Sequence, residues 1–268
     1  MAKFILKRIL YMLVVLFCVV TLTFFLVHSI PGDPITSMVQ DLPMETRDLY
    51  LQKYGFDQPL IVQYVKFIQQ LLTGDLGQSL RYPGRQVVDI VANYAPVSGI
   101  IGGIALAIGF AVGILLGIIA ALNRNRWPDR LVMVLALLGT TIPTFVFAAV
   151  LQYVFTVSIP LFPTTGWGTW GHLVLPVACM CVGPLASYAR YMRSSVLDIT
   201  NQDFILTAEA KGVSSFRIVS RHIFRNSFLP CITMICTSIA GIFSGSFIIE
   251  SIFAIPGLGK YFISAIND

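Results

Sequence analysis

Long uncharged apolar stretches alternate with short charged segments along this chain of 268 residues. A helix needs about 20 apolar residues to cross a bilayer, and a charge at its centre costs about 2.5–3.5 kcal/mol on insertion scales. Charge-free stretches lie between Arg8 and Asp33, between Asp89 and Arg124, between Arg130 and Arg190, and between Arg225 and Glu250. The third is long enough for two helices and is interrupted by prolines. The pattern therefore predicts five membrane spans, at about 9–30, 98–122, 131–159, 171–191 and 229–253.

The first apolar stretch could be read as a signal peptide, because Lys3, Lys7 and Arg8 precede it. It is longer than a signal-peptide core, and no small-residue cleavage site follows, so we expect a permanent span with its N-terminus inside the cell. Alternation then places 1–8, 123–130 and 192–228 inside. Together with Arg190 at the boundary, these segments hold 12 of the 18 basic residues and four of the 13 acidic residues. This bias agrees with the positive-inside rule.

The composition fits a membrane protein, with 56% hydrophobic and 12% charged residues. The net charge of +5 follows from the basic inside segments and gives no reason to expect a nucleic-acid partner. Cys179 and Cys181 are two positions apart, so on a helix their thiols face away from each other. Packing is therefore the expected role of these cysteines, in preference to a metal or redox site.

The inside segment 192–228 is expected to form two short helices. Asn201 can cap the first helix, Gly212 can end it in a left-handed turn, and Ser214 or Ser215 can cap the second. The second helix is expected to have a basic face and an apolar face. The basic face consists of Arg217, Arg221 and Arg225, and the apolar face of Phe216, Val219 and Ile223.

Enzyme signatures are not found in the sequence. The three histidines are too scattered for a zinc motif, and Gly241 to Gly245 does not match a nucleophile elbow. The stretch from Ala254 to Tyr261 departs from a phosphate loop at both ends, and no strand pattern precedes it. We therefore expect no catalytic residue, no metal ligand and no cofactor on this chain, and no ATP site of its own.

A set of motifs identifies a family. The run from Asp203 to Gly212, followed by Arg221-His222 and Leu229-Pro230, resembles the coupling loop of ABC-importer permeases of the dipeptide/oligopeptide/nickel family. In that family a Thr-Ala-x-Ala-Lys-Gly core precedes Arg-His and Leu-Pro. Further family motifs occur in order over essentially the whole chain. They are Pro31-Gly32-Asp33-Pro34, Asp57-Gln58-Pro59-Leu60, Gly74-Asp75-Leu76-Gly77-Gln78-Ser79, Ile142-Pro143-Thr144-Phe145, Arg193-Ser194-Ser195 and Glu250-x-x-Phe253-x-x-Pro256-Gly257-Leu258-Gly259.

The resemblance implies an all-α polytopic membrane helical bundle with the type I ABC-importer permease fold. Residues 1–30 would form an N-terminal transmembrane helix and 31–95 an extracellular or periplasmic helical segment. Residues 96–268 would form the permease core, with a cytoplasmic coupling loop at about 192–228. Family members continue for about another span after the Pro-Gly-Leu-Gly segment, so we expect five spans here and a missing sixth. Many members also carry basic residues near Leu206 and Glu209, so the charge of this coupling helix differs.

The resemblance also implies a function, as a permease subunit in a bacterial cell membrane. It would form the translocation path for di- and oligopeptides delivered by an extracellular or periplasmic solute-binding protein. A homologous second permease and two cytoplasmic ATPase subunits would complete the importer, and those ATPases would use ATP and Mg²⁺. Small residues on the coupling helix can seat in a groove of another protein. The expected ATPase-coupling residues are Asp203, Thr207, Ala208, Glu209, Ala210, Lys211 and Gly212.

Two alternatives stay open. The same machinery could import nickel or metal–chelator complexes. From a different class, the chain could be an ion-coupled secondary transporter, although such proteins place titratable groups near the bilayer midplane and the expected spans have none there.

Polar and helix-breaking residues inside the spans mark a candidate path or gate. Pro143 and its threonine neighbours are expected to break the third span, and Gly183-Pro184 the fourth. Helix packing explains the small residues of the fifth span equally well. Glu250 is an acid near the end of a span and could have a gating or structural role, or lie solvated among the lipid headgroups. The candidates are Thr141, Pro143, Ser244, Gly245 and Glu250.

Overall fold

The computed structural model describes residues 2–29, 52, 55, 57–79, 82, 84–243 and 247–267. These residues form helices, turns and loops, with one isolated β-bridge between Gln78 and Gln86. The chain divides into two compact units, residues 1–89 and residues 90–267. The expected Pro31-Gly32-Asp33-Pro34 motif lies outside the described residues.

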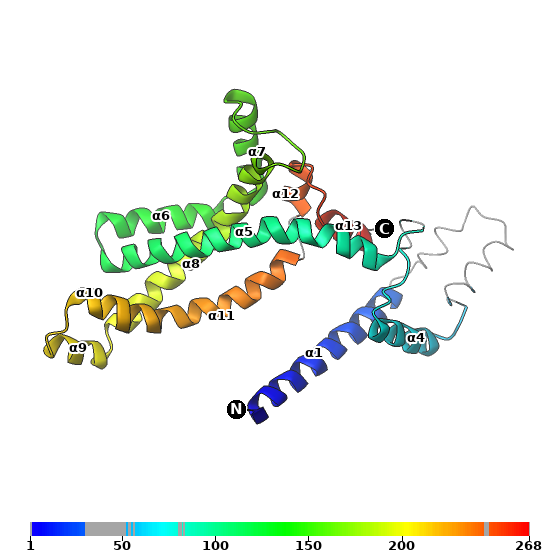
Figure 1. The fold of residues 1–268 in the computed structure, drawn as a ribbon, viewed down its shortest axis with the longest axis horizontal. Helices are drawn as coiled ribbons and strands as arrows, with labels where there is room; N and C mark the ends of the chain where they lie inside the picture. Colours follow the sequence, from blue (N-terminus) through cyan, green and yellow to red (C-terminus); the bar gives the residue numbers. More distant parts are fainter. Residues whose placement is uncertain are drawn as a thin grey trace. The chain divides into compact units, whose positions relative to one another are not determined.

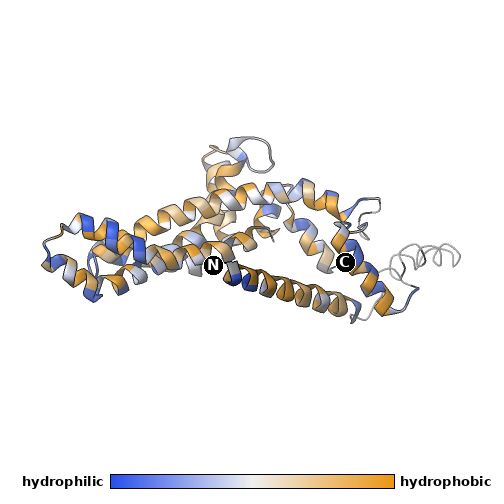
Figure 2. Cartoon of the chain, turned by 60° about the horizontal axis from the view of Figure 1, so that its bottom comes forward, coloured by the Kyte–Doolittle hydropathy of each residue, from blue (hydrophilic) through white to orange (hydrophobic). Residues whose placement is uncertain are grey.

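The first unit contains α1 (Ala2–Ser29) and α4 (Leu60–Thr73). α1 is long and apolar enough to cross a membrane from Lys3 to Ser29, and Figure 2 shows it apolar beyond its basic N-terminal turns. α4 supplies 14 helical residues within the segment 31–95, which was expected to be helical. It ends at Gly74, whose φ of +78° lies in the left-handed region that glycine adopts without steric cost.

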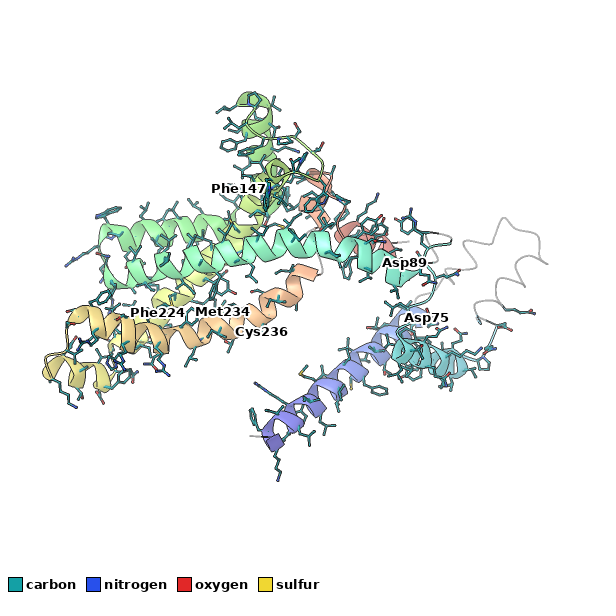
Figure 3. The ribbon with its side chains drawn as sticks, viewed as in Figure 1. Asp75, Asp89, Phe147, Phe224, Met234 and Cys236 are labelled. Atoms are coloured by element: carbon teal, nitrogen blue, oxygen red, sulfur yellow. The ribbon has the colours of Figure 1, made fainter. Side chains whose placement is uncertain are left out.

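The second unit contains most of α5 (Val87–Leu122) and the helices that follow it (Figure 1). α8 is its central element, because α6, α7 and α11 all pack against it. Figure 3 shows Phe224, Met234 and Cys236 spaced along α11. The helices after α5 are α6 (Trp127–Thr141), α7 (Thr144–Gln152), the π-helix η1 (Tyr153–Ser158), α8 (Trp170–Thr200), α9 (Asp203–Ala210), α10 (Ser215–Arg217), the π-helix η2 (Ile218–Ile223), α11 (Phe224–Phe243), α12 (Phe247–Ile252) and α13 (Gly259–Asn267).

The described helices agree with the expected number of spans. Four helices are long and apolar enough to cross a membrane, and a fifth span results if the bent pair of α6 and α7–η1 is one span. The expected break in the third span is confirmed, since α6 ends at Thr141, α7 begins at Thr144, and the two parts are bent by 97°. Pro143 lies between them, and proline disfavours a helical conformation in the residue before it.

The expected break of the fourth span at Gly183-Pro184 is wrong. α8 runs without interruption from Trp170 to Thr200, with Pro176 and Pro184 inside it. α5 lies very close to this stretch, because a Cβ added to Gly109 would be 2.8 Å from the Cβ of Pro184. Neighbouring helices can support the backbone around a proline in a membrane helix, which explains why α8 stays continuous.

The helix that contains most of the fifth expected span begins before that span. α11 begins at Phe224, within the segment assigned to the inside, and ends at Phe243. α12 follows from Phe247 to Ile252. Residues 244–246 between them lie outside the described part of the chain.

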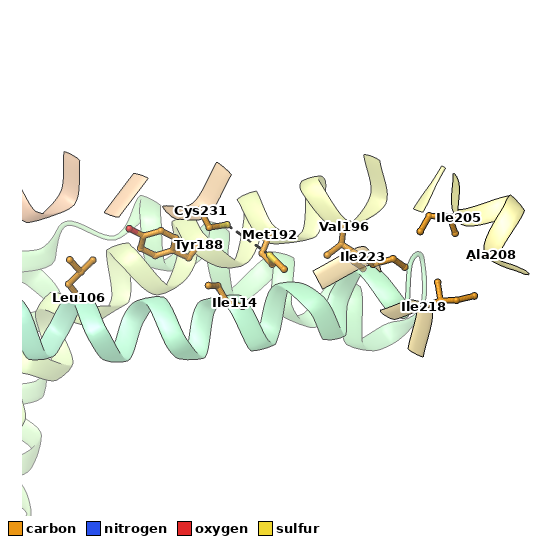
Figure 4. Close-up of a cluster of buried hydrophobic side chains, with 11 residues drawn as sticks. Leu106, Ile114, Tyr188, Met192, Val196, Ile205, Ala208, Ile218, Ile223 and Cys231 are labelled. Atoms are coloured by element: carbon orange, nitrogen blue, oxygen red, sulfur yellow. Dashed lines mark hydrogen bonds between the residues drawn. The ribbon is translucent and has the colours of Figure 1, made fainter. Parts of the chain in front are cut away.

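Three buried apolar clusters lie in the described part of the second unit, and two of them are extensive. The first joins α5, α8, α9, η2 and α11, and Figure 4 shows Ile205 and Ala208 of α9 at its end. In its middle, the Sγ of Cys231 lies 3.9 Å from the Sδ of Met192. The second cluster lies toward the other end of α5, where Ile101 packs with residues of α7, α8 and α12.

Candidate functional site

Most of the expected coupling residues lie on α9, the short helix that follows α8. The N-cap of α9 is Gln202, so the expectation that Asn201 caps this helix is wrong; Asn201 instead ends α8. The side chain of Gln202 makes no capping hydrogen bond, but its carbonyl accepts the N–H of Ile205 at 2.9 Å. Asp203 in the first turn complements the positive end of the helix dipole.

The C-terminal end of α9 is closed by the left-handed turn expected at Gly212, whose φ is +73°. The N–H of Gly212 donates to the carbonyl of Glu209 at 2.9 Å, and the N–H of Val213 donates to the carbonyl of Ala208 at 3.1 Å. These two bonds make a Schellman motif. The chain therefore leaves α9 in a fixed direction, toward α10.

The two faces of α9 differ in burial. Ile205 and Ala208, three positions apart, are 1% and 8% exposed and pack into the first apolar cluster. Ala208 is thus largely buried against its own chain. The other expected coupling residues are exposed, namely Asp203, Thr207, Glu209, Ala210, Lys211 and Gly212. Leu206 lies on the same exposed side and is 59% exposed.

The chain returns to the span through α10 and the π-helix η2. Ser214 takes the N-cap position of α10 without a side-chain hydrogen bond. Phe216 of the expected apolar face is 83% exposed within this chain. A π-helix closes its hydrogen bonds over five residues, and this spacing places Ile218 and Ile223 together in the buried cluster. The basic face is confirmed as exposed at Arg217, Arg221 and Arg225.

An ion pair and hydrogen bonds connect the helices next to α9. Arg193 on α8 makes a two-pronged ion pair with the buried Asp129 of α6, with 2.7 Å between Nη2 and Oδ2. The same Asp129 oxygen accepts the N–H of Asn125 at 2.9 Å. The hydroxyl of Ser195 donates to the carbonyl of Ser227 on α11 at 3.0 Å. The ion pair therefore joins α6 to α8, and the hydrogen bond of Ser195 joins α8 to α11, in the helices from which α9 extends.

The candidate path residues fall at different places. Thr141 and Pro143 are exposed at the bend between α6 and α7, and the hydroxyl of Thr141 donates to the carbonyl of Leu137 at 2.8 Å. A hollow of about 190 Å³ borders this bend, and its lining includes Leu138, Phe147 and Val182 of α8. The lining is mostly apolar, so the hollow offers few hydrogen-bond partners. Ser244 and Gly245 lie outside the described residues.

Glu250 is buried, with 4% of its surface exposed, so solvation among the headgroups is wrong for this residue. One carboxylate oxygen accepts the hydroxyl of Ser98 on α5 at 2.7 Å, and the other accepts the N–H of Gly259 at 2.8 Å. The hydroxyl of Ser98 in turn accepts the N–H of Leu258 at 2.8 Å. The carboxylate therefore joins α5 to the turn that leads into α13.

The close approach of this turn depends on glycine. A Cβ added to Gly257 would lie 2.4 Å from the carboxyl carbon of Glu250, and one added to Gly259 would lie 2.7 Å from a carboxylate oxygen. The sequence spacing Glu250-x-x-Phe253-x-x-Pro256-Gly257-Leu258-Gly259 is thus explained locally. Its two glycines leave room for a carboxylate that bonds the turn.

Three features of this architecture were missed from the sequence. Ser98 had no distinguishing signal among the polar residues that start the second span. The pairing of Asp129 with Arg193 joins residues far apart in the chain, and nothing in their local sequence indicated it. Gly109, Gly113 and Gly117 did carry a signal, because glycine at every fourth position is typical of close helix packing in membranes.

Metal ligation has no support among the described residues, since no group of three His, Cys, Asp or Glu side chains there could hold an ion. The exposed residues of α9 combine charged and polar side chains with Phe204 and Leu206, whereas Ile205 and Ala208 are buried.

Comparison with known proteins identifies the family. Residues 113–268 match the model of the binding-protein-dependent transport system inner membrane component, and residues 1–83 match the model of the N-terminal region of such membrane components. A dipeptide transport system permease protein of Bacillus subtilis (strain 168) is 42% identical over 270 residues, which cover 100% of this chain and 87% of the relative.

Two further relatives are oligopeptide transport system permease proteins. The protein from Haemophilus influenzae is 40% identical and the one from Escherichia coli (strain K12) is 36% identical, each over 98% of this chain and 87% of the relative. The resemblance drawn from the motifs and the expected helical membrane fold are thereby confirmed. On this agreement between motifs, fold and relatives, the chain belongs to the family of binding-protein-dependent transport system inner membrane components.

Proposed function

We propose that this chain is a permease subunit of an ATP-driven importer and forms the translocation path for di- and oligopeptides. The proposal is supported by similarity over the whole chain to permeases whose names specify dipeptide or oligopeptide transport. The chain would lie in a bacterial cell membrane with its N-terminus in the cytoplasm, an orientation supported by the distribution of basic residues. The segment 31–95 would then face outward and the segment 192–228 inward.

In this proposal the chain performs no chemistry. Two separate ATPase subunits would bind and hydrolyse ATP with Mg²⁺ in the cytoplasm. A second, homologous permease would form the other half of the path, and a solute-binding protein would dock on outward surface that includes 31–95. The permease would convert movement of the ATPases into movement of its spans.

The observation that carries the proposal is the construction of α9. Its inner residues Ile205 and Ala208 are built into the apolar cluster of α5, α8, η2 and α11, whereas its outer residues are exposed. A force on the outer face would therefore be transmitted to the spans as a rigid-body displacement, because packed clusters resist continuous deformation. We propose that the outer face of α9 contacts an ATPase subunit through Asp203, Leu206, Thr207, Glu209, Ala210, Lys211 and Gly212. Ala208 has a different part, that of joining α9 to its own spans.

The proposed path runs past the bend at Thr141 and Pro143 and past Ser244 and Gly245 at the junction of α11 and α12. Glu250 would act beside this path by holding the turn before α13 in place. Its contacts with Ser98 and Gly259 occupy both carboxylate oxygens, which supports this positioning role over direct contact with a peptide.

The coupling proposal is tested by charge substitution on α9 in the complete transporter. Leu206→Asp places a charge on the outer face of α9, and Leu161→Asp makes the same change at a residue of similar exposure, 65% against 59%, in the loop before α8. Peptide uptake by proteoliposomes and retention of the ATPase subunits during purification are measured. We expect the transporter with Leu206→Asp to lose peptide uptake or to lose its ATPase subunits during purification. We expect the transporter with Leu161→Asp to retain both.

Normal uptake by Leu206→Asp would contradict the coupling role of α9. Uptake by the unmodified transporter in ATP-free vesicles with a proton gradient would contradict the importer and favour the ion-coupled alternative. The cargo is tested by mass spectrometry of the ligand that co-purifies with the binding protein. A nickel or metal–chelator complex in place of a peptide would contradict the peptide assignment alone.

A further inference from the structure

α4 has three faces that differ in what they contact. Tyr64 and Phe67 face α1, as their ring contacts with Phe24 show. The polar residues Gln63, Lys66, Gln69 and Gln70, with Val62 among them, lie on a second face, centred about 120° around the helix from the first. Between these two faces runs a stripe at positions i, i+4, i+7 and i+11, which we term the outer stripe. The outer stripe consists of Ile61, Val65, Ile68 and Leu72.

The outer stripe has little cover within its unit. Leu72 is 82% exposed, Ile61 is 65% exposed and Val65 is 47% exposed. Exposing such a continuous row of apolar side chains to water is unfavourable, with a free-energy cost of about 25 cal/mol per Å² of apolar surface. A row of this size on a 14-residue helix is typical of a surface that is covered in the native environment.

The contacts between α4 and α1 place the stripe at a particular depth. The hydroxyls of Tyr64 and Thr21 are hydrogen-bonded at 2.7 Å, and the ring centroids of Tyr64 and Phe25 are 5.4 Å apart. Thr21 precedes the end of α1 at Ser29 by eight residues, or about 12 Å at 1.5 Å per residue. α4 is therefore attached alongside the last turns of the membrane-spanning helix, within its apolar length.

The surface of α1 at this level is itself apolar and exposed among the described residues. Leu22 is 62% exposed and Leu26 is 66% exposed. The outer stripe continues that surface on a second helix. Amphipathic helices that lie in the bilayer interface have this combination of an apolar face in the acyl boundary and a polar face toward water. Tyr64 beside the stripe fits the aromatic belt of such interfaces.

We propose that α4 lies in the headgroup–acyl boundary of the bilayer, with the outer stripe covered by lipid acyl chains. Lys66 is the only charge on α4, so apolar burial and not attraction to anionic lipids would hold it there. α4 then lies in the bilayer interface beside the end of α1, with its polar face toward the aqueous phase. The inference needs only that α1 spans the membrane, so it does not depend on the coupling role of α9.

The test measures the accessibility of spin labels on the full chain, purified with its partner subunits and reconstituted in phosphatidylcholine vesicles. Single cysteines replace Ile61, Leu72 and Gln70, with Leu22→Cys as a reference in α1. The exposed Cys18 and Cys236 and the half-buried Cys181 are replaced by serine, and the buried Cys179 and Cys231 are retained to preserve packing. Collision of each nitroxide with oxygen, which concentrates in lipid, is compared with collision with a water-soluble nickel chelate.

We expect the ratio of oxygen to nickel collisions at Ile61 and Leu72 to match that at Leu22 and to exceed that at Gln70 by about tenfold, as an interfacial helix requires. A high nickel collision rate at Leu72, equal to that at Gln70, would mean that water covers the stripe and would overturn the proposal. Low collision rates with both reagents would mean that protein covers it, which would overturn the proposal equally. Matching thermal unfolding of each labelled variant and the parent shows that the fold is intact.

Discussion

At the scale of single residues, the buried network of Glu250, Ser98 and the following turn is the most specific arrangement in the second unit. The hydroxyl of Ser98 donates to the carboxylate and accepts the N–H of Leu258, so it serves as both donor and acceptor. The carboxylate also accepts the N–H of Gly259. Removing Ser98 leaves the N–H of Leu258 and one carboxylate oxygen without these bonds, and removing Glu250 does the same to the N–H of Gly259 and the hydroxyl proton of Ser98, at a cost of about 1–3 kcal/mol for each unsatisfied group.

This network predicts non-additive effects on stability. Glu250→Ala and Ser98→Ala should each lower the thermal unfolding midpoint of the purified transporter. The double variant should lose less than the sum of the two, because residues in one network couple by about 0.5–3 kcal/mol. Thr207→Ala, on exposed α9, serves as a distant control and should be additive with Glu250→Ala. Additive effects of Ser98→Ala and Glu250→Ala would contradict the network.

At the scale of elements, the contact between α5 and α8 is made through glycine. A Cβ added to Gly113 would lie 2.7 Å from the carbonyl oxygen of Leu185, and one added to Gly117 would lie 2.6 Å from the carbonyl oxygen of Ala189. These neighbours are backbone atoms and cannot move aside as a flexible side chain would. The two helices must separate to admit any larger residue, and the apolar cluster beneath α9 would open with them.

A matched pair of glycines on α5 tests this packing. Gly113→Ala should lower the unfolding midpoint, because its methyl group meets the backbone of α8. Gly103→Ala should leave it unchanged or raise it, since nothing lies within 4 Å of the added Cβ and alanine favours a helix by about 1 kcal/mol over glycine. Thermal unfolding of the two variants against the parent is the measurement. Equal destabilisation by both would show that close approach to α8 is not what Gly113 provides.

The elements also show what local sequence determines and what it does not. The spans and the bend at Pro143 were predictable, because apolar length and proline act through the local chain. Pro184 carries the same local signal, yet α8 continues through it. The reason is a tertiary contact, because α5 approaches closely at Gly109 and supports the backbone around the proline. The joint burial of Ile218 and Ile223 was not indicated by the α-helical reading of this segment, because η2 is a π-helix.

The candidate site was predictable in a similar, partial way. The position of α9 and the left-handed turn at Gly212 follow from local signals. The burial of Ala208 and of Glu250 does not, because both depend on residues from other helices that pack over them. The pairing of Arg193 with Asp129 is likewise set by the way α8 meets α6.

At the scale of the whole molecule, the proposed function of this chain is to transmit movement of the ATPase subunits to its membrane spans. Its charges are distributed as membrane topology requires, its spans carry few polar groups, and α9 is joined to several of those spans by one apolar cluster. In the proposed function, the energy for transport comes from separate ATPase subunits. We propose that these ATPase subunits contact the outer face of α9.

The most direct test of this claim is site-specific photo-cross-linking in the assembled transporter. A photoreactive amino acid is placed at Leu206 on α9 and, as a matched control, at Leu161 in the loop before α8. The account predicts an adduct between this chain and an ATPase subunit from position 206 and none from position 161. Absence of an ATPase adduct at position 206, in a complex that contains the ATPases and still transports peptide, would contradict it.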